Sequence, residues 1–499
     1  QTCALPILLQ NSTNLHSLKV FGSISDNQFI FFVLKIENRK LEIENTLAHP
    51  GIQTLTVYTV SLGCPKNRVD TERMLGRLGP AYRAAPEARS ADIVLVNTCG
   101  FIQPAVEESL ETILELAEDL KDLSPKPLLA VTGCLLARYG QELCDQLPEV
   151  DLWLTFQEQA SWERRLAPRL KARAGAASPA PRLEPDSPPL FGRQLSTGPG
   201  TAYLKINEGC RHACSFCLIP RLRGPLVSVP MQSLIQEARE LLDQGVRELC
   251  IVAQDVSDYG RDLGLETGLQ SLLEQLAPLS GLHWLRLMYL YPAGLTRELL
   301  GFLKQLGPPF LPYFDIPLQH AHPEILKRMG RPFQVDAQAV IQRIRDFFPE
   351  ACIRSTFITG FPGETEDHFQ TLFRFLQTQR LHHVGVFSFS PEPGTRAATF
   401  GPAVPEPVRE ERRDRLLQAQ AAISREHLAR VLDRKVEVLI ERSDPGWPTL
   451  FQGRTWFQAP EVDGITYIST LEAGPGRIIP CRIEETKTYD LIALEEPAA

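Results

Sequence analysis

The 499-residue chain lacks the features of several large classes of protein. Its apolar runs, such as FIFFVL at residues 29–34, are far shorter than the ~20 residues that a membrane-spanning helix needs. It has no Walker phosphate loop and no Gly-x-Gly-x-x-Gly after a strand, so nothing supports nucleotide-triphosphate or nicotinamide chemistry. Its net charge of −8 at pH 7 gives no overall attraction to nucleic acid.

Cysteine is also sparse, with 11 residues in the whole chain and no basic and apolar leader sequence. This usage argues against a disulfide scaffold and favours a reducing compartment, where thiols bind metal or fill cores. The expected location is therefore the cytoplasm.

Asparagine is scarce after the first fifty residues, where only Asn67, Asn97 and Asn207 occur. The first fifty residues hold five asparagines and begin with QTCALPI instead of Met. We expect residues 1–51 to be a doubtful extension, either an artefact of sequence assembly or a disordered segment, and we exclude it from the functional argument.

The remaining chain divides into three predicted domains and a linker. Apolar strand-like runs alternate with amphipathic segments over residues 52–171, which predicts an open parallel α/β sheet. Residues 172–199 are rich in Ala, Pro and Ser, as in a linker. Six strand-and-helix units over 200–432 predict a partial (β/α)6 barrel with its site at the strand C-termini. Short strands over 433–499 predict a small β-barrel.

Three cysteines lie close together in the loop NEGCRHACSFCLIP, which follows the first predicted barrel strand. A structural zinc site needs a fourth ligand, and no second cysteine pair lies near Cys210, Cys214 and Cys217. Three thiolates with Cys-x-x-x-Cys-x-x-Cys spacing suit a 4Fe-4S cluster with one open iron, the signature of radical S-adenosylmethionine (SAM) enzymes. The alternative is three unligated thiols, although free cysteine is normally a core residue.

A second set of cysteines ends three predicted strands. Cys64, Cys99 and Cys134 follow LTVYTV, DIVLVN and PLLAVT at equal spacings of 35 residues. Ligands bind beyond the carboxyl ends of parallel strands, so these sulfurs could hold a second cluster, although each alone is more commonly a core residue. The cysteines without such company are expected to be buried thiols: Cys144, Cys250, Cys352 and Cys481.

Eight further motifs occur between about residues 54 and 370: SLGCPKNRVDTE, VNTCGFI, VTGCLLARY, YLKINEGCRHACSFCLIPRLRG, IVAQD, LMYLYP, YFDIPLQHA and FITGFPGETEDHF. Together they resemble the methylthiotransferase family, and GRTWFQAPEVDGITYI resembles its C-terminal TRAM domain. The resemblance covers about residues 54–494. It implies that Cys64, Cys99 and Cys134 hold an auxiliary 4Fe-4S cluster that carries or donates sulfur. It also implies that Cys210, Cys214 and Cys217 hold the radical-generating cluster.

The resemblance implies that SAM acts both as radical source and as methyl donor, for net transfer of a CH3–S group. No residue beyond the cluster ligands is assigned a catalytic role. Four residues near the predicted strand ends are expected to contact SAM: Phe216, Gln254, Gly360 and Glu364. An ordinary tight turn is the alternative for the TGFPGE segment. Asp255 is a further candidate at the ribose, and His320 and His322 are candidates at the substrate entrance.

The family divides mainly into enzymes that modify an adenosine of tRNA and one that modifies the β-carbon of an aspartate in ribosomal protein S-twelve of the small subunit. GCPKNRVD, RLMYLYP and DIPLQHA resemble the ribosomal-protein branch. Residues 435–499 contain five more acidic than basic residues, which disfavours RNA and favours a basic protein.

We therefore expect ribosomal protein S-twelve as substrate. The further partners expected are an electron donor such as flavodoxin or ferredoxin and a sulfur donor, with no membrane. RNA binding through TRAM is possible but not favoured. The alternatives are a tRNA methylthiotransferase and a noncatalytic iron–sulfur protein that binds RNA.

Overall fold

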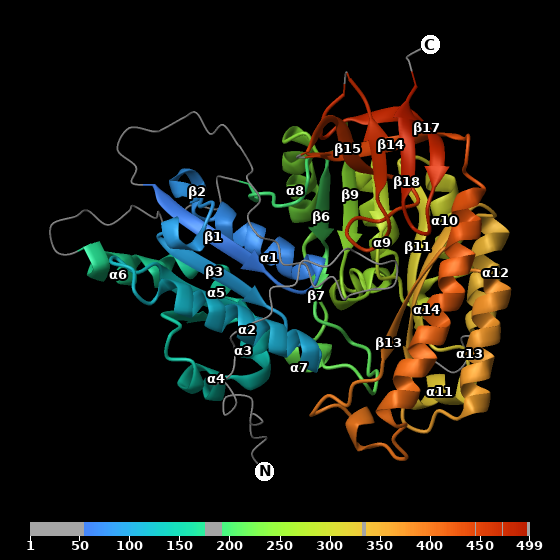
Figure 1. Cartoon of the computed structure of the whole chain (residues 1–499), viewed down its shortest axis with the longest axis horizontal. Helices are drawn as coiled ribbons and strands as arrows, with labels where there is room; N and C mark the ends of the chain where they lie inside the picture. The colour runs from blue at the N-terminus through green and yellow to red at the C-terminus, as the bar shows by residue number, and fades with distance from the viewer. Residues whose placement is uncertain (1–53, 175–191, 332–335, 445, 472, 497–499) are drawn as a thin grey trace.

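The computed structural model describes residues 54–174, 192–331, 336–444, 446–471 and 473–496. The extension expected at residues 1–51 lies outside the described residues, as do residues 175–191 of the expected linker. In the described ranges, no helix is long and apolar enough to span a membrane. Figure 1 shows an N-terminal sheet on the left, a larger sheet with outer helices on the right, and a small β-barrel at the upper right.

The N-terminal domain is a five-stranded parallel sheet in the order β2-β1-β3-β4-β5. Its strands are β1 (Leu55–Ser61), β2 (Tyr82–Ala84), β3 (Ile93–Thr98), β4 (Leu128–Gly133) and β5 (Leu152–Leu154). Its helices are α1 (Pro65–Gly76), α2 (Gln103–Leu120), α3 (Cys134–Tyr139), α4 (Gln141–Gln146), α5 (Phe156–Gln159) and α6 (Trp162–Ala174). Every residue of β3 and β4 is buried, as in a central parallel strand that is covered on both faces. The prediction of an open parallel α/β sheet is confirmed.

The second domain is a six-stranded parallel sheet in the order β13-β12-β11-β10-β9-β6. Its strands are β6 (Thr201–Lys205), β9 (Glu248–Val252), β10 (Trp284–Leu287), β11 (Phe310–Gln319), β12 (Cys352–Thr359) and β13 (His383–Ser388), and β7 (Asn207–Glu208) and β8 (Val227–Ser228) form a separate small ribbon. Its helices are α7 (Ile219–Leu222), α8 (Met231–Asp243), α9 (Gly268–Leu276), α10 (Arg297–Leu306), α11 (Pro323–Arg328), α12 (Ala337–Phe347), α13 (Glu366–Gln379) and α14 (Glu406–Ala429). The predicted partial (β/α)6 barrel is confirmed.

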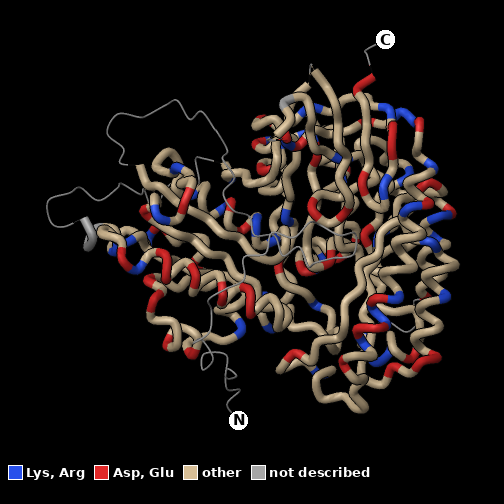
Figure 2. The backbone as a smooth tube through the Cα atoms, in the orientation of Figure 1, with Lys and Arg blue, Asp and Glu red and all other residues tan. Residues whose placement is uncertain are grey.

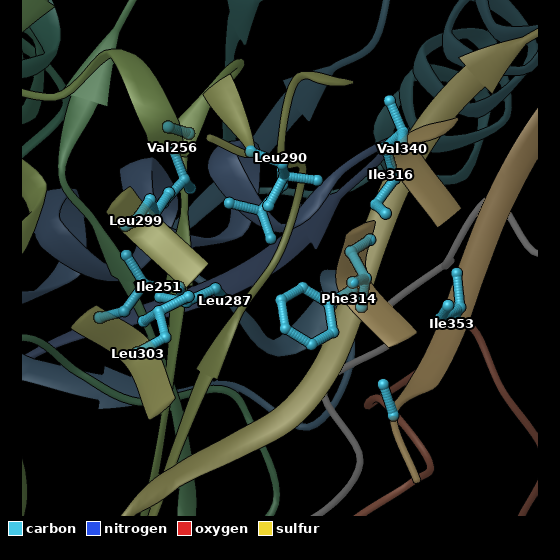
Figure 3. Close-up of a cluster of buried hydrophobic side chains, with 14 of the residues drawn as sticks. Ile251, Val256, Leu287, Leu290, Leu299, Leu303, Phe314, Ile316, Val340 and Ile353 are labelled. Atoms are coloured by element: carbon cyan, nitrogen blue, oxygen red, sulfur yellow. The ribbon is translucent and has the colours of Figure 1, made fainter. Parts of the chain in front are cut away.

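Apolar packing seals the outer face of this sheet. Figure 3 shows Ile251, Leu287 and Phe314 from three neighbouring strands beside Leu299 and Leu303 of α10, and all five belong to one buried cluster. Because these side chains fill the space between sheet and helices, polar chemistry is confined to the strand ends and to the inner face.

The C-terminal domain is a closed five-stranded barrel, as predicted. Its strands are β14 (Lys435–Asp444), β15 (Trp447–Thr455), β16 (Thr466–Ser469), β17 (Ile478–Thr486) and β18 (Leu491–Glu495). Residues at the end of β15 and just beyond it lie against the inner face of the six-stranded sheet. Arg454 pairs with Glu248 at 2.6 Å, and Asp463 pairs with Arg354 at 2.6 Å and accepts a hydrogen bond from Tyr313 at 2.7 Å. The small barrel therefore packs directly on the larger domain.

Helix α1 joins all three domains through buried ion pairs. Asp70 contacts Lys205 of β6, and Glu72 lies 2.9 Å from Arg193. Arg68 reaches the C-terminal domain, 2.5 Å from Glu461. Buried charges are stable only when closely paired, so these contacts fix the position of α1 against the barrel.

Candidate functional site

Cys64, Cys99 and Cys134, here called the auxiliary triad, lie at the carboxyl edge of the N-terminal sheet. They follow β1, β3 and β4, which are neighbours in the sheet. The register pairs Ser61 with Asn97 and Asn97 with Thr132, so the three strand ends are level. The predicted convergence of three cysteines from separate strands is therefore present in the structure.

Two glycines allow the loops of the auxiliary triad to approach closely. A Cβ atom on Gly63 would lie 2.9 Å from Cβ of Cys99 and 3.0 Å from its Sγ. A Cβ on Gly133 would lie 2.4 Å from the carbonyl oxygen of Thr98, and Gly133 has a φ of 107°. Only glycine fits such contacts with this backbone conformation.

The barrel contributes a positive charge to the auxiliary triad. Arg223 follows α7, and its Nε donates to Sγ of Cys134 at 3.4 Å, while its Nη1 contacts Asp70 at 3.0 Å and Glu208 at 2.8 Å. Burial lowers the pKa of Arg223, but the charges of Cys134, Asp70 and Glu208 more than offset this effect, and its pKa stays well above the ordinary value. A permanently charged guanidinium therefore lies beside the auxiliary triad.

Cys210, Cys214 and Cys217, here called the loop triad, follow β6 at the carboxyl edge of the barrel sheet. The backbone N–H of His212 donates to Sγ of Cys210 at 3.4 Å, and that of Ile219 donates to Sγ of Cys217 at 3.4 Å. Such donors stabilise sulfur when it carries negative charge.

All of the shifted thiol pKa values in the two triads lie above the ordinary range. Burial, and then the charges of the other two triad sulfurs, raise the pKa of Cys99 to about 12. Burial is also the main cause that raises the pKa of Cys217 to about 12 and that of Cys210 to about 11. These thiols keep their protons at neutral pH in the metal-free protein, so metal binding has to displace them.

The distances between the cysteine sulfurs test whether either triad could bind a single zinc ion. Four sulfurs around one zinc ion at ~2.3 Å would lie ~3.8 Å apart. Within the described ranges, no three cysteine sulfurs lie within 4.8 Å of one another. Neither triad therefore has its three sulfurs at the spacing of a single tetrahedral zinc ion.

Several polar atoms near the ends of the barrel strands and after α11 are buried and have no hydrogen-bond partner among the described residues. They are Oδ1 of Asn207, Oε1 of Gln254, Oε1 of Gln319, and Nε and Nη1 of Arg331. Unpaired buried polar atoms are rare, and several in one place indicate a polar ligand. This region, here called the barrel entrance, fits the expected SAM site.

The residues expected to contact SAM have different surroundings. Gln254 lies at the barrel entrance, where its Nε2 donates to Glu208 at 3.2 Å. Phe216 packs in an apolar cluster with Met329 and Phe361. Contact of Phe216 and Gln254 with SAM stays a prediction.

Gly360 and Glu364 contact each other and α14. The Gly360 N–H donates to Glu364 at 3.0 Å, and Glu364 accepts from Arg412 at 2.7 Å. His320 is buried, 3.3 Å from Glu364, while His322 is partly exposed at the start of α11. Their roles toward SAM or substrate also stay predictions.

The remaining residues that the sequence singled out are the four cysteines outside the triads and Asp255. Cys250, Cys352 and Cys481 are buried as expected, whereas Cys144 on the short helix α4 is only partly buried, so that expectation was wrong. Asp255 accepts from Ser257 and lies 2.7 Å from Nε2 of His212.

A buried ion pair joins the loops of the N-terminal domain to the barrel beside the auxiliary triad. Arg138 of α3 lies 2.8 Å from Glu392, which follows β13, and also donates to the carbonyl of Gly100 at 3.0 Å. Glu392 in turn accepts from the N–H of Gln103 at 2.8 Å. We call Arg138 and Glu392 the latch.

Sequence reasoning did not single out Arg223, the latch or the crowded glycines. Gly63, Gly133 and Arg223 lie inside the quoted motifs, next to the cysteines or shortly after them, and this adjacency was the available signal. Glu392 gave no signal, because its partner is far away in the sequence.

A six-stranded parallel sheet with the loop triad at its carboxyl edge defines the chain as a radical SAM protein. Family models match in the same order as the domains: "Uncharacterized protein family UPF0004" over residues 56–155, "Radical SAM superfamily" over 204–376 and "TRAM domain" over 434–494.

Curated relatives match nearly the whole described chain. The ribosomal protein uS12 methylthiotransferase RimO of Nitratidesulfovibrio vulgaris (strain DP4) is 54% identical over 441 residues, which cover 88% of this chain and 100% of the relative. The protein of the same description from Lawsonia intracellularis is 46% identical and covers 89% and 98%. That from Geobacter sulfurreducens is 41% identical and covers 87% and 97%. The chain belongs to the ribosomal protein uS12 methylthiotransferase RimO family.

Proposed function

We propose that this enzyme adds a methylthio group to the β-carbon of an aspartate in ribosomal protein uS12, the protein S-twelve of the small subunit. The observation that carries the proposal is the pair of cysteine triads, each with three sulfurs, in domains that are fixed to each other. Family membership supports the same activity. The relatives named above do not support the alternatives of a tRNA enzyme or a noncatalytic RNA-binding protein.

The loop triad would hold the 4Fe-4S cluster that works with SAM, and the auxiliary triad would hold a second 4Fe-4S cluster. When bound, these cofactors supply hydrogen-atom abstraction and sulfur for a carbon that a thiolate cannot attack. The net reaction replaces the hydrogen of a C–H bond with CH3–S.

The protein's own residues hold the two triads at a fixed separation. Arg223 follows the loop triad by six residues and donates to Cys134 of the auxiliary triad. The latch fixes the Cys99 and Cys134 loops to the barrel. A hydrogen abstraction and a sulfur transfer at the same carbon need such fixed geometry.

The charge distribution supports a basic protein as substrate. Figure 2 shows acidic residues along α2, which contains no Lys or Arg. The exposed acidic residues of α2 are Glu107, Glu111, Glu115, Glu118 and Asp119. Since α2 follows the Cys99 loop, its negative face would attract a basic protein and repel RNA phosphates.

Two further partners complete the proposal, an electron donor such as flavodoxin or ferredoxin and a donor of sulfur. Because ribosomal proteins are made and assembled in the cytoplasm, we place the reaction there.

The proposal is tested with anaerobically reconstituted protein, SAM and dithionite. Purified uS12 and total tRNA are offered separately, and mass spectrometry of each is expected to find one added CH2S in uS12 and no change in tRNA. The Cys217→Ala variant serves as the inactive control. A modified tRNA adenosine with unmodified uS12 would contradict the proposal.

A further inference from the structure

Lys66 is a buried lysine without a hydrogen bond or ion pair to any described residue. It is the second residue of α1, two positions after Cys64, and is 8% exposed. In contrast, Arg68 and Arg73 on the same helix each pair with a carboxylate. Its stem is buried while its Nζ, which is not among the buried side-chain atoms of the described residues that lack a hydrogen bond, stays accessible, so the ammonium is free to bind a ligand of opposite charge.

The Lys66 ammonium lies over the ring of Tyr289, 3.7 Å from the ring centroid. Tyr289 follows β10 in the LMYLYP motif. Burial raises the pKa of its hydroxyl, and the charges of Asp315 and Cys64 raise it further. Tyr289 and the Lys66 ammonium are thus close to the auxiliary triad.

The same segment reaches the loop triad two residues later. Tyr291 stacks on His212, which lies between Cys210 and Cys214, with ring centroids 3.8 Å apart. Two residues span at most about 7 Å, and the left-handed backbone of Tyr289, with a φ of 59°, is not fully extended. Residues 289–291 therefore connect the surroundings of the two triads, and Lys66 lies at the auxiliary end of this connection.

Asp315 of the barrel is a charged group that interacts with Lys66, and it has other partners. Its carboxylate accepts the N–H of Tyr289 at 3.2 Å and lies 3.8 Å from Arg354. Burial raises the pKa of Asp315, while Arg354 and, more weakly, Lys66 lower it. Asp315 and Lys66 form no ion pair, so the Lys66 ammonium can still form one with the carboxylate of a ligand.

We propose that Lys66 binds the side-chain carboxylate of the substrate aspartate and selects an acidic side chain over a neutral one. This inference rests on the proposed function, since it needs an aspartate as substrate. The β-carbon is bonded directly to that carboxylate, so a carboxylate on Lys66 places the reacting carbon beside the auxiliary triad. The ring of Tyr289 restricts the ammonium to one position.

Binding of two matched peptides tests the proposal. Peptides from uS12 with either the target aspartate or asparagine are titrated into full-length, cluster-reconstituted protein. We expect the parent protein to prefer the aspartate peptide. Lys66→Gln is expected to lower the affinity for the aspartate peptide by about tenfold or more, because a charge-assisted contact is lost. The affinity for the asparagine peptide should stay unchanged. Lys126→Gln, a partly exposed lysine of the same domain, should behave like the parent.

Iron content, the cluster spectrum and thermal unfolding are measured on the same samples. Since Lys66 has no hydrogen bond or ion pair to a described residue, Lys66→Gln and Lys66→Met should lower the unfolding temperature only slightly, through loss of the contact with the Tyr289 ring. Lys66→Met serves as the second variant if Lys66→Gln is unstable. Retained preference for aspartate in these variants overturns the proposal, and so does loss of iron, which would assign Lys66 to the cluster. If the parent protein neither binds nor modifies uS12, the proposed function itself fails, irrespective of Lys66.

Discussion

The two cysteine triads are built in opposite ways. The loop triad comes from one short segment, so its spacing is set locally by the sequence. The auxiliary triad comes from three strand ends and exists only because β1, β3 and β4 are neighbours in register. The first should tolerate changes elsewhere in the fold, whereas the second should depend on backbone packing at a distance from its sulfurs.

Removal of the loop triad should have the largest effect. We expect Cys210→Ala, Cys214→Ala and Cys217→Ala together to abolish SAM cleavage and to leave about half of the iron, because the other triad lies in a separate domain. Iron analysis measures the remaining cluster, and formation of 5′-deoxyadenosine measures SAM cleavage. Full iron content in this triple variant would contradict the presence of two clusters.

Removal of the auxiliary triad should separate the two halves of the reaction. With Cys64, Cys99 and Cys134 all changed to Ala, 5′-deoxyadenosine should still form, while the methylthio product disappears. If the cysteines only filled a core, each change would lower stability by about 1–3 kcal/mol and reduce both activities in parallel. An unchanged ratio of product to cleavage would count against the auxiliary cluster.

A backbone change should affect only the auxiliary triad. Gly133→Ala places a Cβ 2.4 Å from the Thr98 carbonyl, whereas Gly140→Ala, also at positive φ, meets nothing within 4 Å. Both should lose about 1–3 kcal/mol of stability from backbone strain. We expect only Gly133→Ala to lose auxiliary iron as well, as measured by iron content and absorbance after reconstitution. Equal iron in the two variants would show that close packing is unimportant.

Weakening of the latch should have the smallest effect on the chemistry, because it lowers stability and the coupling of cleavage to product but leaves both clusters in place. Glu392→Gln removes the charge that pairs with Arg138, and breaking a buried pair is expected to lower stability by about 3–5 kcal/mol. The product-to-cleavage ratio should fall severalfold, while iron content and cleavage without substrate stay the same. The double variant Glu392→Gln/Arg138→Gln should lose less stability than the sum of the losses in the two single variants. Additive losses would argue that the pair does not act as a unit.

The same contrast explains what could be predicted from the sequence. The loop triad was visible as one motif, and the alternation of apolar and amphipathic segments predicted the α/β class of the first two domains. The auxiliary triad was inferred from the common position of its cysteines after strands, and that inference needed the three strands to be neighbours. The short strands β2 and β5 were missed, since each has only three residues.

Contacts between domains could not be predicted. Glu392 and Arg138 are separated by 254 residues, and nothing in their local sequence marks either as a partner. Lys66 lies in a quoted motif, but its lack of a partner is a property of the packed structure. Pairing and burial of such polar residues depend on tertiary packing, on which local sequence patterns carry no information.

The most direct test is the mass of uS12 in cells. A bacterial strain that lacks its own uS12 methylthiotransferase is supplied with this chain, and uS12 and tRNA are then analysed by mass spectrometry. We expect uS12 to gain one CH2S on the β-carbon of a single aspartate, with tRNA unchanged and no gain when the Cys64, Cys99 and Cys134 variant is supplied. Unmodified uS12 together with full SAM cleavage by the purified protein, or a methylthio group on a tRNA adenosine, would contradict the account.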